Sequence, residues 1–130
     1  MDERPWWCEI DIRIVHSDLD PFALTQLLQI EPSFAQLPGE SKVPHGKCLS
    51  AGYWCVSHRV EYPDRPDIAI TWAESFIRSH ELEIQKLLNK EADVNIYLGI
   101  HSSVMAVGFV FPTIRTIERL NLQLGIEYFS

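Results

Sequence analysis

The chain has 130 residues, of which 46% are hydrophobic, and this size and composition are typical of one globular domain and exclude an intrinsically disordered chain. Its formal net charge of -7 argues against a nucleic-acid-binding protein, because such proteins need a basic stripe to replace phosphate counterions. We therefore expect a single domain over residues 1–130 with no nucleic-acid partner.

The sequence predicts neither a targeting segment nor a disulfide framework. The first residues, MDERPWWCEI, are charged and lack the apolar core of a signal peptide. The longest apolar run, residues 104–112, is too short to span a bilayer. The three cysteines, Cys8, Cys48 and Cys55, are odd in number and form no C-x-x-C pair, which disfavours disulfides and a zinc knuckle. We expect a cytoplasmic protein with free thiols and no membrane contact.

The first predicted elements are a strand, a helix and a long loop. Residues 7–15 alternate between apolar and charged side chains, as in a strand with one buried face. The stretch HSDLDP then breaks the strand, and Asp20 and Pro21 suit the cap and first turn of a short helix. Pro32 ends this helix, because proline disfavours the helical conformation in the residue before it. Residues 32–52 are rich in proline and glycine and predict a loop.

The remaining chain predicts an α+β fold. Residues 52–62 resemble a second strand, and residues 67–89 form the longest predicted helix, with a kink near residues 79–81. The runs VNIYLGIH and MAVGFVF are predicted to form a hairpin, with the second strand central because it is apolar on both faces. Pro112 begins a third helix, Gly125 ends it, and IEYF forms an edge strand. The order β-α-β-α-β-β-α-β predicts a mostly antiparallel sheet with helices packed on one face.

The stretch HSDLDP has two chemical interpretations. His16, Asp18 and Asp20 are residue types that hold a cation or act as an acid/base pair. However, Asp20 followed by Pro21 is a typical helix start, and Asp18 adds favourable negative charge near the helix N-terminus. We therefore interpret HSDLDP as the end of a strand and the cap of a helix.

Other catalytic signatures fail on spacing. The stretch HELEI at His80 has Ile84 where a zincin needs its second histidine. Cys55 and His58 are predicted to lie on one strand and to point to opposite faces, which is poor geometry for a nucleophile pair. The sequence contains neither a G-x-S-x-G elbow nor a glycine-rich phosphate loop. We predict that the chain is not an enzyme and that it holds no metal or cofactor.

Aromatic and charged residues on the predicted strands favour binding of another protein. Trp and Tyr are frequent anchors of protein interfaces, and an acidic surface suits a basic partner. Trp6 and Trp7 are adjacent in a strand, so only one of them faces inward. The loop 33–52 is the alternative contact surface. The candidate partner-binding residues are Trp6, Glu9, Asp11, Tyr53, Arg59 and Glu61.

A small-ligand or regulatory domain is the alternative function. In this interpretation the long loop covers one end of the sheet, and Trp54 or Tyr97 lines a pocket. For Trp54 itself we favour a place in the core, because Trp is as frequent in cores as at binding surfaces.

Several short motifs together resemble the bacterial family called domain of unknown function 4279. They are DLDPFALTQLLQIEPS at residues 18–33, Gly39 in the loop, GYW at residues 52–54 and the final LGIEYFS. Members of this family are similar in having a strand, D-x-P, a helix ending in a Leu-Gly-x-x-P-like turn, a glycine-containing loop and a G-x-W strand. One departure is Gln29, which stands where the helix-ending glycine is expected. The resemblance implies a small cytoplasmic α+β domain and no particular reaction.

Small acidic domains of this kind are also similar to the immunity proteins of bacterial toxin systems, which neutralise basic toxins through complementary charge. By this analogy we hypothesise a non-catalytic protein-binding domain of the immunity-protein kind.

Overall fold

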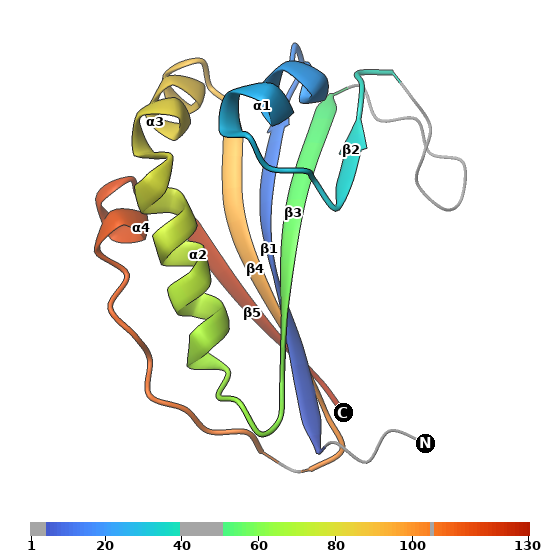
Figure 1. Ribbon diagram of the computed structural model, residues 1–130, viewed down its shortest axis with the longest axis vertical. Coiled ribbons are helices and arrows are strands. Elements are labelled where there is room, and N and C mark those ends of the chain that lie inside the picture. The colour runs from blue at the N-terminus through green and yellow to red at the C-terminus, as the bar shows by residue number, and fades with distance from the viewer. Residues whose placement is uncertain (1–4, 40–50, 105) are drawn as a thin grey trace.

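The computed structural model describes residues 5–39, 51–104 and 106–130, and the α+β prediction is confirmed (Figure 1). Its central strand, β1, pairs with β3 and β4 in antiparallel orientation, whereas β5 lies parallel to β4 at one edge. The mostly antiparallel sheet is therefore mixed. In order across the sheet, the strands are β2 (Phe34–Gln36), β3 (Gly52–Glu61), β1 (Trp6–His16), β4 (Asp93–Ser102) and β5 (Gln123–Phe129).

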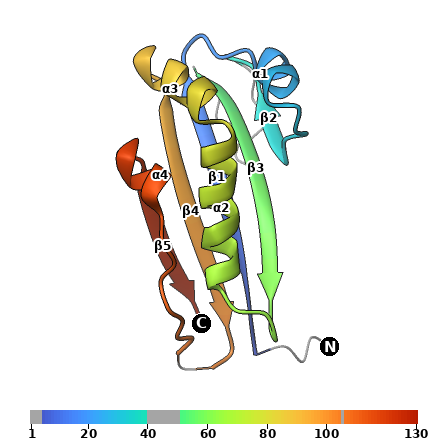
Figure 2. The same ribbon diagram turned by 60° about the vertical axis from the view of Figure 1, so that its left-hand side comes forward.

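The helices of the described part pack on one face of this sheet (Figures 1 and 2). The longest of them, α2, runs across β1, β3 and β4. The predicted kink is a break, because His80 leaves helical geometry at φ -121° and separates α2 from α3. Within the described residues, no helix is long and apolar enough to cross a membrane. The helices are α1 (Pro21–Leu28), α2 (Asp67–Ser79), α3 (Glu81–Asn89) and α4 (Arg115–Arg119).

The alternating pattern of the first strand determines which face is buried. Ile10, Ile12 and Ile14 are fully buried under the helices, and each contributes about 1.5–3 kcal/mol by leaving water. The residues between them point to the other side of the sheet. Because the described helices pack on only one face of the sheet, the charged residues of β1 are gathered on the opposite face.

The prediction that MAVGFVF is a central strand is wrong. Residues 106–114 pair with no strand of the sheet, and Val110 and Phe111 are 82% and 48% exposed. The edge of β4 is occupied by β5 instead, and a parallel pair requires a crossover connection. Residues 106–122 lie in this crossover, along the edge of the helical layer (Figure 1).

The predicted third helix is also shorter than its apolar pattern indicated. It covers only α4, and Asn121, in the left-handed region at φ 56°, follows its end. Gly125 is not a helix-ending residue, because it lies inside β5. The predicted edge strand at the C-terminal end is confirmed. The long loop contains β2, which we did not predict, and its residues 40–50, including Cys48, lie outside the described residues.

The end of α1 makes Gln29 the site of a stabilising substitution. Gln29 has φ 57°, a left-handed conformation that favours glycine, and its N–H donates to the Thr25 carbonyl at 2.8 Å. Gln29→Gly should raise the free energy of unfolding by about 0.5–1 kcal/mol, because relief of this conformation outweighs the added freedom of the unfolded chain. Urea denaturation measures the change. Gln29→Ala keeps the Cβ atom and is the control, and equal stability of the two variants would contradict the explanation.

Candidate functional site

The face of the sheet that the helices leave uncovered is the candidate functional site, and we call it the open face. Alternate residues of β1, β3, β4 and β5 point to it, and the strand register places them in adjacent rows. Most of these side chains are half-buried rather than freely solvated. Its central residues are Trp7, Glu9, Asp11, Arg13, Tyr53, Cys55, Ser57, Arg59, Glu61, Tyr97, His101, Glu127 and Phe129.

Four of these residues form a continuous stack across four strands, which we call the stacked row. The guanidinium of Arg59 lies 4.0 Å from the ring centre of Trp7. The ring of Trp7 stacks on His101 with centres 4.0 Å apart, and His101 stacks on Phe129 at 4.6 Å. The row therefore presents the edges of large flat side chains whose positions are fixed by their neighbours.

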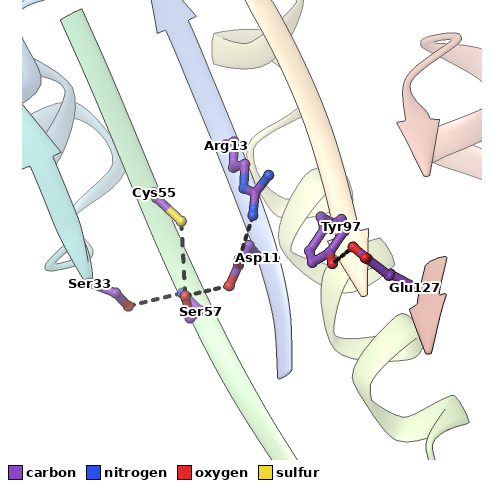
Figure 3. Close-up of polar contacts among 7 residues, drawn as sticks. All are labelled: Asp11, Arg13, Ser33, Cys55, Ser57, Tyr97 and Glu127. Carbon is purple, nitrogen blue, oxygen red and sulfur yellow. Dashed lines mark hydrogen bonds and ion pairs between the residues drawn. The ribbon is translucent and has the colours of Figure 1, made fainter. Parts of the chain in front are cut away.

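A polar network lies beside the stacked row (Figure 3). The guanidinium of Arg13 lies over the ring of Tyr97, 4.6 Å from its centre, and is 3.0 Å from Asp11. Burial is the largest single effect on the pKa of Arg13 and lowers it, but the hydrogen bond to Asp11 and the attraction of neighbouring acidic groups together outweigh burial, so the pKa is raised. The hydroxyl of Tyr97 donates to Glu127, and this bond raises the pKa of Tyr97. These contacts hold the charged side chains in one arrangement before any partner binds.

A hollow of about 460 Å³ lies at the β2 side of the open face, and we call it the β2 hollow. Phe34 and Tyr53 form its aromatic wall, with ring centres 5.4 Å apart in an edge-to-face arrangement. Ser57 donates to Asp11 at 2.6 Å across its floor (Figure 3). Its lining residues are Glu9, Asp11, Ser33, Phe34, Tyr53, Cys55 and Ser57.

Two titratable side chains that line the hollow, Cys55 and Tyr53, are held in their neutral forms. Burial raises the pKa of the Cys55 thiol, and the Asp11 carboxylate raises it further. Burial also raises the pKa of Tyr53 to about 12. A thiol is a nucleophile only as thiolate, so this arrangement does not activate Cys55. Cys55 is itself buried, because the residue is only 5% exposed.

The stretch HSDLDP caps a helix, as predicted. The Asp20 carboxylate accepts hydrogen bonds from the N–H groups of Phe22 and Ala23 at 3.0 and 3.4 Å. His16 Nε2 donates to the Lys90 carbonyl at 2.8 Å, and its Nδ1 accepts from the N–H of Asp18 at 3.0 Å. Both ring nitrogens of His16 therefore bind backbone groups. In the described ranges, no three His, Cys, Asp or Glu side chains lie close enough to share a metal ion.

The candidate partner-binding residues fall on the open face with one exception. Glu9, Asp11, Tyr53, Arg59 and Glu61 come together there. Trp6 does not, because it is 8% exposed and belongs to the core. The neighbouring residue, Trp7, lies at the surface instead. The alternation that buries Cys8 and Ile10 also points Trp6 inward and Trp7 outward. Trp7 was therefore identifiable from the strand pattern.

The two candidate ligand-binding residues cannot line one pocket. Trp54 is fully buried between the sheet and the helices, where its indole N–H donates to the Thr25 hydroxyl at 3.1 Å. Its predicted place in the core is confirmed. Tyr97 lies on the opposite face of the sheet, with Arg13 over its ring. Another hollow, of about 620 Å³, lies between α1 and α3, and His16, Asp18 and Asp20 contribute to its wall.

Two further residues of the open face, His101 and Phe129, were missed from the sequence. They stand beside Trp7 only because β4 and β5 adopt their particular register, which periodicity does not determine.

The comparisons with known proteins identify one family. The model of a domain of unknown function (DUF4279) matches residues 8–129, which is nearly the whole chain. Neither a curated protein nor a solved structure matches the chain.

Proposed function

The chain belongs to the DUF4279 family, and we propose that it is a non-catalytic protein-binding domain whose open face docks a basic partner. The observation that carries this proposal is the stacked row, in which Arg59, Trp7, His101 and Phe129 lie in contact on the sheet face that no described helix covers. Trp, Tyr and Arg dominate the binding energy of protein interfaces, and the row concentrates such side chains at the surface.

The rigidity of the open face supports the same proposal. Trp7 and Tyr97 are each covered on one side by an arginine of the same face. Arg13 is in turn fixed by Asp11, and Tyr97 by Glu127. Side chains that are already ordered lose little conformational freedom when a partner covers them, which favours tight binding.

The charge of the open face supports a basic partner. Glu9, Asp11, Glu61 and Glu127 contribute carboxylates to it, whereas the described strands contribute the guanidinium groups of Arg13 and Arg59. The whole chain carries a formal net charge of -7. Complementary charge accelerates encounter and disfavours acidic competitors. A basic toxin neutralised by this chain as its immunity protein is the kind of partner that we propose.

Site-specific crosslinking tests which face docks the partner. A photo-crosslinking amino acid at Glu61, on the open face, should capture a protein in cells that naturally contain this chain. The same amino acid at Leu82, which is 76% exposed on α3, is the matched control and should capture nothing. Capture from Leu82 alone would place the binding surface on the helices and contradict the proposal.

Affinity measurements with the captured protein test the stacked row. Trp7→Ala should weaken its binding by about 30-fold, because Trp7 lies at the centre of the row and truncated hot spots cost about 2 kcal/mol or more. Phe22→Ala removes an aromatic ring that is 66% exposed on α1 and should leave the affinity within about threefold. Thermal melts serve to check that both variants fold. An unchanged affinity for a folded Trp7→Ala variant would reject the row as the binding site.

A further inference from the structure

We propose that the β2 hollow is the subsite for an arginine side chain of the partner. This inference rests on the proposed function and names the chemistry that the partner must bring to the open face. The hollow combines an aromatic wall, formed by Phe34 and Tyr53, with the carboxylates of Glu9 and Asp11. Both kinds of group attract a guanidinium, the ring through its π face and the carboxylate through charge-assisted hydrogen bonds.

The open face already binds two guanidinium groups of its own chain in this way. Arg13 lies over the ring of Tyr97 and pairs with Asp11 at 3.0 Å. Arg59 lies over the ring of Trp7, and its Nε is 3.8 Å from Glu61. Each arrangement consists of one ring, one carboxylate and one guanidinium. The described residues that line the β2 hollow supply the ring and the carboxylate, and they include neither Arg nor Lys.

Glu9 is the carboxylate that a guanidinium would engage. Its side chain is exposed and makes no hydrogen bond or ion pair with any described residue. Arg59 stands directly opposite Glu9 in the sheet, but its guanidinium is turned to Trp7 and Glu61. Asp11 is already engaged by Arg13 and Ser57. The negative charge of Glu9 is therefore available at the hollow.

The geometry favours arginine over lysine. A guanidinium is flat, stacks on a ring and donates two parallel hydrogen bonds to one carboxylate, whereas an ammonium is a compact, strongly hydrated point charge. The neutral hydroxyl of Ser57 and the neutral thiol of Cys55 add no charge to the lining of the hollow. A side chain from a docked protein enters the hollow directly, since the hollow opens on the same face as the stacked row.

Titration with a small probe tests the subsite without the partner. N-acetyl-arginine methylamide, added to the isotope-labelled chain, should produce saturable shifts in the backbone amide signals of Glu9, Phe34 and Ser57. N-acetyl-citrulline methylamide has nearly the same shape without the charge and should produce none. N-acetyl-lysine methylamide should bind at least about threefold more weakly than the arginine probe. Equal binding of the citrulline or lysine probe would overturn the assignment to arginine.

Matched variants assign the binding to the hollow. Glu9→Gln should weaken the arginine probe by about tenfold, because it removes a charge-assisted pair. Glu118→Gln makes the same charge change at an exposed position of α4 and should leave the affinity within about twofold. Equal effects of the two variants, or no saturable shift in the wild-type chain, would reject the subsite. If the probe fails while Trp7→Ala still weakens the captured partner, the arginine subsite is lost and the docking face stands.

Discussion

Replacing Gly52 by alanine should lower the free energy of unfolding by about 3 kcal/mol, since forced overpacking of a rigid site lies at the upper end of its usual range. A Cβ atom at Gly52 would lie 2.3 Å from the Leu19 carbonyl oxygen and 2.8 Å from Leu19 Cβ. The carbonyl belongs to the backbone of HSDLDP and cannot rotate away like a side chain. Leu19 is itself fixed, because it is 7% exposed and its N–H donates to the His16 carbonyl.

Chemical denaturation measures this change, and another strand glycine provides the control. A Cβ atom at Gly125 would meet its nearest atom, in Tyr97, at 3.8 Å, which is an ordinary contact. Gly125→Ala should therefore change stability by less than about 0.5 kcal/mol. If Gly52→Ala were as stable as Gly125→Ala, the turn of HSDLDP would have to be free to move, and the close contact would have no structural role.

The same contact explains two motifs that carried the family resemblance. The glycine of GYW allows the backbone of HSDLDP to approach β3, and the tryptophan of GYW donates to Thr25 in the helix that HSDLDP begins. The Thr25 hydroxyl donates in turn to the Pro21 carbonyl at 2.8 Å. These motifs, distant in sequence, form one junction between α1 and the sheet. Gly52 and Trp54 identify the fold through packing, whereas Tyr53 between them lies on the open face.

The candidate site was predictable where it depends on one strand and unpredictable where it depends on register. Alternation along β1 predicted that Glu9 and Asp11 point away from the core. The same alternation, extended to the first two residues of the strand, predicts that Trp6 points inward and Trp7 outward. In contrast, the stack of Trp7 on His101 depends on the pairing of β1 with β4, which is nonlocal. No local pattern contains this information.

The incorrect central strand has a related physical cause. Residues 105–111 are apolar on both faces, and a short apolar run fits a buried strand and a crossover segment packed on the core equally well. Which of the two forms depends on the free edge of β4, because that edge can pair with only one strand. In the structure β5 pairs with it in parallel orientation. Val107 and Phe109 then pack partly on the core without joining the sheet.

Glu74 stabilises this crossover and is the site of the second large effect. Its side chain is 5% exposed in α2, and one carboxylate oxygen accepts from the N–H groups of Thr116 and Ile117 at 2.9 and 3.0 Å. These two residues lie in the first turn of α4 and are almost fully buried, so water cannot replace the carboxylate. A side chain from one helix thus caps the first turn of another.

Glu74→Leu should lower the free energy of unfolding by about 3 kcal/mol, because two buried N–H groups lose their acceptor at about 1–3 kcal/mol each. Glu74→Gln keeps an oxygen in the same place and should cost only about 1 kcal/mol. Glu118→Leu, at an exposed position of α4, is the control and should change stability by less than about 0.5 kcal/mol. Urea denaturation separates the three, and a glutamine variant as unstable as the leucine variant would show that charge matters more than capping.

The effect of Glu74→Leu should extend to the open face. Because α4 lies within the crossover that brings β5 beside β4, loss of its cap should loosen β5 and with it Phe129, the outer member of the stacked row. We expect faster hydrogen exchange in the amides of β5. Exchange in β3 should be unchanged, because β3 pairs with β2 and β1 and not with β5. Binding of the captured partner should then weaken in Glu74→Leu and persist in Glu74→Gln. Uniformly faster exchange across the whole sheet would instead indicate global destabilisation and contradict a local role for the crossover.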